Sequence, residues 1–233
     1  MDQRDPVEAR HHHIGKDEVR RLGHCRRQSG IAIRDGIHSL IVVIDTDTDR
    51  VIDTLSVPCP YIDVASLDDA GNVYFSNWVY SLGPTLLSGH AQACAVRLRP
   101  GEDRIDPEWS LTFADVTGGR EAAALRFVGG RKAVLSVFHD EEVRLDGTDP
   151  ASLADSAHWR FWMLDLDTLE ASPIADIAPH AGGFATARIE GRTFLMVPSG
   201  DYESTNVYEL SVDAAASLRW SVPGWATELF ALR

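Results

Sequence analysis

The chain has 233 residues, of which 44% are hydrophobic and 24% charged, a composition typical of a packed globular protein. Acidic residues outnumber basic ones by 35 to 22, which gives a formal net charge of -13 at pH 7. This charge repels phosphate backbones and anionic lipid surfaces, so we expect no nucleic acid partner. The longest aliphatic run, Leu40 to Ile44, is far shorter than the roughly 20 residues that a membrane-spanning helix needs. We therefore expect no transmembrane segment.

Residues 1–39 differ in character from the rest of the chain. Every aromatic residue lies at or after Tyr61, and the opening segment offers only scattered aliphatic residues among several arginines. We expect a disordered or poorly packed basic segment here, acting as a flexible tail, an interaction arm or sequence upstream of the true start. It lacks the unbroken apolar stretch of a signal peptide, so we expect a cytoplasmic protein if the sequence is complete as given.

From residue 40 to residue 233 the chain alternates short apolar runs with polar turns, which is the period of β-strands rather than helices. In one group of segments, an apolar alternating run is followed by a polar turn and then by a second alternating run. We predict that each of these segments forms a β-hairpin: Leu40–Val57, Ala93–Phe113, Phe161–Ile177 and Asn206–Val222.

A second group of predicted hairpins has glycine at the turn, where its freedom to adopt a positive φ suits a tight connection. These hairpins are Ile62–Trp78, Glu121–Phe138 and Phe184–Pro198. Their turn glycines, Gly71, Gly130 and Gly191, lie 59 and 61 residues apart, a spacing that fits four-stranded propeller blades with loops. The two groups alternate along the chain, so one hairpin of each kind makes one blade.

The sequence therefore predicts an all-β domain over residues 40–233, a partial β-propeller of about 3.5 four-stranded blades. The run Ala226–Leu232 is predicted to be the first strand of one more blade. A two-sheet β-sandwich is the alternative architecture. Because closed propellers carry about 4 to 8 blades, we expect either the C-terminal half of a larger propeller or self-association through open blade edges.

The three cysteines, Cys25, Cys59 and Cys94, follow no metal-binding or redox spacing. Cys59 and Cys94 either form a disulfide, as in a protein built for an oxidising compartment, or remain two buried free thiols. The sequence leaves both alternatives open.

Several segments resemble known propeller families. Residues 41–55 (IVVIDTDTDRVIDTL) resemble the YVTN-type repeat, and the segments GNVYFSNWVYS (71–81), SVFHDE (136–141) and PSGDYESTNVYEL (198–210) resemble MxcI-like proteins. MxcI-like proteins are cell-envelope propellers associated with myxochelin-type siderophore gene clusters. The resemblance covers residues 40–233, and it implies a periplasmic or cell-envelope location with siderophore-uptake components as partners. It carries no catalytic motif that can be transferred to this chain.

A candidate metal site follows the predicted strand that ends at Phe138. His139 and Asp140 offer imidazole and carboxylate ligands to a cation, and the negative net charge favours the approach of cations. Adjacent residues of a strand point to opposite sides, so these two chelate together only if the strand has already ended. Asp201 occupies the equivalent place two hairpins further on. The alternative for all three is a solvated turn.

Loops just beyond strand ends are where a propeller most readily binds a small molecule. The candidate ligand-binding residues at such ends are Asn77, Trp78, Arg120, Glu121 and Tyr202. Trp78 either stacks on a ligand or is wedged between blades. Arg120 either binds an anionic group of the ligand or pairs with Glu121 or Asp115.

The chain contains no nucleophile elbow, P-loop, dinucleotide fingerprint or zincin motif. The absence of these motifs favours a non-enzymatic binding protein. The resemblance to MxcI-like proteins implies a binding propeller associated with siderophore-mediated iron acquisition, whose ligand or cofactor is a divalent cation or a ferric siderophore. One alternative is a metal-dependent propeller hydrolase or lactonase that uses His139. The other is an interaction scaffold that recruits a protein partner through open strand edges.

Overall fold

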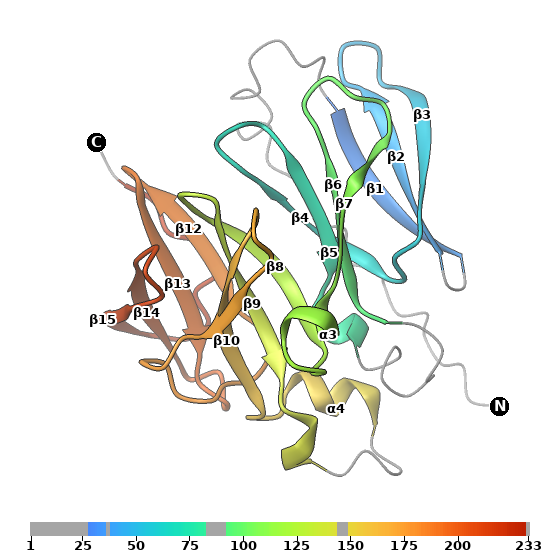
Figure 1. The fold of residues 1–233 in the computed structure, drawn as a ribbon. Helices are drawn as coiled ribbons and strands as arrows, with labels where there is room; N and C mark the ends of the chain where they lie inside the picture. Colours follow the sequence, from blue (N-terminus) through green and yellow to red (C-terminus); the bar gives the residue numbers. More distant parts are fainter. Residues whose placement is uncertain (1–27, 36–37, 83–91, 144–148, 232–233) are drawn as a thin grey trace, which may run out of the picture.

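The computed structural model describes residues 28–35, 38–82, 92–143 and 149–231 (Figure 1). Strands dominate this part of the chain and form four antiparallel sheets. The first sheet has three strands in the order β1–β2–β3, which are β1 (Gln28–Asp35), β2 (His38–Asp45) and β3 (Arg50–Val57).

The other three sheets have four strands each, and in each sheet the strands lie in chain order. The second sheet contains β4 (Ile62–Leu67), β5 (Val73–Asn77), β6 (Cys94–Leu98) and β7 (Ile105–Thr112). The third contains β8 (Ala122–Gly129), β9 (Lys132–Phe138), β10 (Trp159–Asp165) and β11 (Ala171–Pro173). The fourth contains β12 (Ala185–Ile189), β13 (Arg192–Pro198), β14 (Ser204–Leu210) and β15 (Ala216–Pro223). Short helical turns α3 (Phe113–Val116), η1 (Asp140–Glu142) and α4 (Pro150–Ala154) lie between strands.

Each sheet is an up-and-down meander, and the sheets follow one another along the chain as the blades of a propeller do. Hydrogen bonds from the backbone of β8 to serine side chains of β5 and β4 join the third sheet to the second. Leu125 N donates to Ser76 Oγ at 3.1 Å and Phe127 N donates to Ser66 Oγ at 2.7 Å. The predicted partial propeller is confirmed, with three four-stranded blades and one three-stranded blade, and all the predicted hairpins are present.

The inner strand of the third sheet shows why the sequence folds this way. β8 reads AAALRFVG, and every residue except Arg126 is buried. The small side chains of Ala122, Ala123 and Ala124 are fully buried, as the crowded centre of a propeller requires. β8 therefore packs against neighbours on both of its sides, because the second and fourth sheets cover it.

The main core lies between the second, third and fourth sheets, and its largest fully buried side chains include Trp159, Phe113 and Phe138. A second hydrophobic cluster packs the first sheet on the second. A disulfide between Cys59 and Cys94 fastens the link after β3 to the start of β6, so the disulfide alternative for this pair is the one observed.

Two segments differ from the sequence-based expectation. β1 and the start of β2 precede residue 40, where the predicted propeller begins, while residues 1–27 of the expected basic segment lie outside the described residues. Residues 225–231 form no strand, although Ala226–Leu232 was predicted to begin a blade. Instead Ala226 and Leu229 pack on the fourth sheet, and Ala226 N donates to Thr205 Oγ1 at 2.9 Å. No fifth sheet is present in the described residues to pair with this segment, so side-chain packing decides its course.

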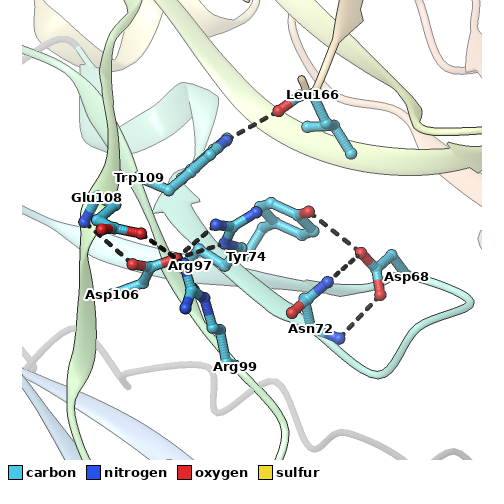
Figure 2. A network of polar contacts seen from close by, with 9 residues as sticks. All are labelled: Asp68, Asn72, Tyr74, Arg97, Arg99, Asp106, Glu108, Trp109 and Leu166. Atoms are coloured by element: carbon cyan, nitrogen blue, oxygen red, sulfur yellow. Dashed lines mark hydrogen bonds and ion pairs between the residues drawn. The ribbon is translucent and has the colours of Figure 1, made fainter.

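A polar network ties the outer strands of the second sheet together, as Figure 2 shows. Asp106 has a side chain only 1% exposed, and its Oδ2 accepts hydrogen bonds from Arg97 and from Arg99 Nε at 2.9 Å. Burial raises the pKa of Asp106, but the bonds from Arg97 and from Glu108 N outweigh it and hold that pKa below its usual range. The carboxylate therefore stays charged and pairs β6 with β7 by side chains as well as by backbone.

The same network reaches the third sheet. Trp109 of β7 donates from Nε1 to Leu166 O at 2.9 Å, and its ring meets the Tyr74 ring edge-on with centroids 4.9 Å apart. Tyr74 donates to Asp68 Oδ2 at 3.1 Å, and burial is the main cause that raises the pKa of Tyr74 to about 12. The bond from Trp109 to Leu166 thus joins the second sheet to the third, while the Tyr74 and Asp68 contacts stay within the second sheet (Figure 2).

Candidate functional site

All eight sequence-predicted site residues lie at one end of the sheets. β5, β9 and β13 end there, β8 begins there, and α3 and α4 lie on the same side (Figure 1). We call this end the α3–α4 face. It carries the last residue of β5 and the one that follows it, two residues before β8, two after β9 and two after β13. These residues are Asn77, Trp78, Arg120, Glu121, His139, Asp140, Asp201 and Tyr202.

Asn77 and Trp78 are held between sheets. Asn77 is 1% exposed and donates from Nδ2 to Ala122 O at 3.4 Å, while its Oδ1 has no hydrogen-bond partner in the described part of the chain. The Trp78 ring lies 5.5 Å from the Phe184 ring, and the Arg126 guanidinium lies 5.7 Å from its centroid. The half-buried indole, which follows β5 of the second sheet, thus packs against Arg126 of the third sheet and Phe184 just before the fourth, which is the structural alternative considered for Trp78.

Glu121 links the second and third sheets. Its Oε2 accepts a hydrogen bond from Ala93 N at 3.2 Å, just before β6. Burial is the main cause that raises the pKa of Glu121, and the nearby charge of Asp140 raises it further. A carboxyl group with a raised pKa is the kind of group that can hold a proton for a ligand.

Arg120 pairs with neither Glu121 nor Asp115 but with Glu141. Its Nη2 lies 2.8 Å and its Nε 3.1 Å from Glu141 Oε1. The hydrogen bond from Arg120 is the main cause that lowers the pKa of Glu141 to about 2. Glu141 also contacts His139, whose Nδ1 lies 2.9 Å from Oε1. The arginine is therefore engaged within the protein, where the sequence left a ligand as one alternative.

A second ion pair lies beside the first. Glu142 accepts a hydrogen bond from Arg160 Nη2 at 2.7 Å, and its other oxygen is 3.5 Å from His158 Nδ1. The donor atoms of His139, Glu141 and Glu142 all lie within 4.8 Å of one another, which is close enough for one cation. The strand ends at Phe138 and η1 turns the chain, so the residues that join His139 are Glu141 and Glu142.

The other two predicted metal ligands lie outside this group. In the described residues the cluster of donor atoms contains neither Asp140 nor Asp201. Asp201 Oδ1 accepts hydrogen bonds from Ser199 Oγ at 2.5 Å and from Glu203 N at 3.1 Å, an arrangement that closes the turn after β13. The structure thus places Asp201 in a solvated turn, the alternative considered for it.

The structure adds a residue that the sequence did not reveal. Asp155, which follows α4, accepts at Oδ1 from two tyrosine hydroxyls, Tyr80 at 2.7 Å and Tyr202 at 2.8 Å. Burial is the main cause that raises the pKa of each tyrosine, and the bond to Asp155 adds to it. The three residues lie in connections of the second, third and fourth sheets, between β5 and β6, β9 and β10, and β13 and β14, so this contact joins the three sheets at the α3–α4 face. Trp225 packs on Tyr202 with ring centroids 5.4 Å apart.

His180 is the most deeply buried titratable group of this face. Its ring stacks on Phe161 at 3.8 Å with an interplanar angle of 10°, and its Nδ1 contacts Ala181 O. Burial lowers the pKa of His180 to about 4, so the ring is neutral near pH 7. With Nδ1 donating to the carbonyl, Nε2 is left as an acceptor, and no hydrogen-bond partner for it lies among the residues that the structure describes.

Comparisons with known proteins identify no family for this chain. No protein-family model matches the chain, and no curated protein matches it. A solved structure of the Dos1 propeller aligns with a TM-score of 0.49 at 10% identity, covering 80% of this chain and 44% of that one. A mutant of Synechocystis apocarotenoid oxygenase aligns with a TM-score of 0.41 at 10% identity, covering 82% of this chain and 43% of that one. The chain therefore spans less than half the length of either protein, and the propeller assignment rests on its own sheets. No helix among the described residues is long and apolar enough to cross a membrane.

Proposed function

We propose that this chain is a non-enzymatic binding propeller that acts in siderophore-mediated iron acquisition at the cell envelope, with its ligand site on the α3–α4 face. The ligand is a siderophore in its free or ferric form. The resemblance of residues 40–233 to MxcI-like proteins supports the iron context. The Cys59–Cys94 disulfide supports a periplasmic or envelope location, because disulfides persist in oxidising compartments and are rare in the cytosol.

The observation that carries the proposal is a set of polar atoms at this face that are buried and lack a hydrogen-bond partner within the described residues. They are Asn77 Oδ1, His139 Nε2 and His180 Nε2. Buried polar atoms are nearly always paired, so these atoms call for hydrogen bonds from a bound molecule or from ordered water. A small molecule that carries several hydroxyl or amide groups supplies such bonds, and siderophores are molecules of this kind.

Tryptophan fluorescence tests this proposal, since Trp78 and Trp225 both lie at the α3–α4 face. We expect a saturable change on titration with a free or iron-loaded myxochelin-type siderophore. His139→Gln, which alters one of the unpaired groups, should weaken binding by about tenfold, the value of one hydrogen bond to a ligand. The matched control is Asp213→Asn in the β14–β15 turn, at the opposite end of the sheets, which should leave binding unchanged. Absence of saturable binding by the folded chain contradicts the proposal.

One observation favours a second candidate, a metal-dependent hydrolase or lactonase. His139, Glu141 and Glu142 place three donor atoms where a divalent cation can bind. The arginines that pair with the two carboxylates oppose this, because a cation must displace Arg120 and Arg160. The test is metal analysis of the purified chain together with ester and lactone turnover. The candidate is supported if His139→Ala abolishes both the bound metal and the turnover while Asp140→Ala keeps both. It is rejected if His139→Ala keeps the metal content and the turnover of the wild-type chain.

A further inference from the structure

The fourth sheet carries apolar side chains on the side turned away from the third sheet, which we call its outward face. Register across the sheet places Ala185, Met196, Val207 and Trp220 in one row on this side. Met196, Val207 and Phe194 form a hydrophobic cluster that is separate from the main core. Ala185 packs on this cluster, and the Trp220 ring packs on the Phe194 ring. Of the rest of the described chain, this cluster meets Ala226 and Leu229, and Trp220 remains 48% exposed.

The inner strands show that this face lacks a neighbouring sheet in the described residues. β8, which has a sheet on each side, is buried at every position but one. β12 holds the equivalent place in the fourth sheet, yet none of its five residues is fully buried. A sheet with apolar residues on both sides needs cover on both sides, because each exposed apolar area costs free energy in water.

The first sheet has an outward face of its own. Ile41 and Leu55 point toward the second sheet, and they are paired with each other across β2 and β3. The alternate residues of β2, Leu40, Val42 and Ile44, therefore point away from the second sheet, and Val51 of β3 lies opposite Ile44 on that side. Val51 is 61% exposed. Both end sheets of this partial ring thus present apolar outward faces.

Charged side chains lie at the far end of both faces. The turn between β2 and β3 lies at the end opposite the α3–α4 face and carries Asp45, Asp47 and Asp49 beside Arg50. At the same end of the fourth sheet, Arg192 and Arg219 share a single carboxylate, Glu209, at 2.5 and 2.7 Å. Glu190 and Asp213 lie in the adjoining turns, so the excess of positive charge is confined to the Arg192–Glu209–Arg219 cluster. This cluster can face the carboxylates of the β2–β3 turn, which favours contact between the two sheets.

We propose that a second copy of this chain covers both outward faces, with the first sheet of each copy packed on the fourth sheet of the other. Such a contact is heterologous, and two copies related by a twofold axis along the propeller axis close it into a ring. Each copy contributes four sheets, so the ring has eight, within the range of about 4 to 8 that propellers use. The ring leaves neither outward face in water.

Light scattering on the size-fractionated full chain tests the pairing. We expect a mass twice the 25.6 kDa of one chain. Val51→Lys and Trp220→Lys each place a charge on one outward face and should each reduce the mass to that of one chain. The matched control is Leu218→Lys, because Leu218 is 55% exposed on the same strand as Trp220 but pairs with Tyr208 and points to the other side of the sheet. It should keep the double mass. Circular dichroism confirms that each variant is folded.

Mixing the two variants distinguishes this arrangement from a symmetric contact of one face with itself. A Val51→Lys copy keeps a native fourth sheet and a Trp220→Lys copy keeps a native first sheet, so one complete interface re-forms and the double mass returns. A wild-type mass of one chain at every concentration, as expected if other blades of a longer polypeptide cover these faces, overturns the proposal. So does a mass above two chains, or a mixture that stays at the mass of one.

Discussion

Removing the carboxylate of Asp106 should destabilise the second sheet more than any other single charge change there. Asp106→Ala leaves the guanidinium of Arg97, whose side chain is 18% exposed, without its counter-charge between β6 and β7. Breaking a fully buried ion pair from one side costs about 3–5 kcal/mol, and breaking an exposed pair costs about 0–1 kcal/mol. Because Arg97 keeps some contact with water, we expect a loss of about 3 kcal/mol in the free energy of unfolding.

Urea unfolding followed by tryptophan fluorescence measures this loss, and a thermal scan should show a midpoint lower by about 6–12 °C for a domain of this size. The matched control is Glu108→Ala. Glu108 also contacts Arg99, but its side chain is 80% exposed, so its removal should leave the midpoint unchanged.

The pH dependence separates charge from packing. The pKa of Asp106 lies below its usual range in the folded protein, so its contribution is complete above the unfolded value of about 4 and is lost as pH falls through the folded pKa. The difference between Asp106→Ala and wild type should therefore shrink at low pH. A difference below about 0.5 kcal/mol at pH 7, or one that does not change with pH, would refute the charge argument.

Three further predictions concern the α3–α4 face and the first sheet. Gly182→Ala should destabilise the protein by about 1–3 kcal/mol in urea unfolding, because an added Cβ meets the Trp159 ring at 2.8 Å, and an unchanged midpoint contradicts this packing. Cys59→Ser opens a disulfide between positions 35 residues apart and should cost about 4 kcal/mol, whereas equal stability of the wild-type protein with and without reductant contradicts the disulfide. The pKa of His180 is lowered to about 4 in the folded protein, so between about pH 6.5 and pH 4 the unfolded chain binds a proton that the folded chain does not. The free energy of unfolding should therefore fall as pH drops through this range. His180→Phe should flatten that slope, and a variant with the wild-type slope argues against a buried neutral ring.

The blades could be predicted from the sequence because their signals are local. Glycines at Gly71, Gly130 and Gly191 each sit within a single hairpin, and the alternation of apolar and polar residues around them needs no information from elsewhere in the chain. The same local rule failed for Ala226–Leu232, whose apolar alternation is strand-like. A strand also needs a neighbour to bond with, and that neighbour is missing from the described residues.

The sequence predicts on which face the candidate residues lie, but not which of their side chains contact one another. Strand ends locate every candidate residue on one face, yet which side chains meet depends on small changes of direction. Arg120 and Glu121 are adjacent and reach different partners, Glu141 and Ala93 N, because successive extended residues point to opposite sides. Tyr80 and Tyr202 meet Asp155 across separations of 75 and 47 residues. No local pattern encodes a contact over that distance.

The two ends of these sheets differ in how freely they can change during evolution. At the far end, β8 passes to β9 and β12 to β13 through turns of two residues, and a change of length there would shift strand register. At the α3–α4 face the connections are longer and begin after the strands have finished pairing, as in residues 139–158 between β9 and β10. Insertions at that end can therefore accumulate without disturbing the backbone ladder. Related chains should diverge in ligand preference through these connections while the sheets keep their spacing.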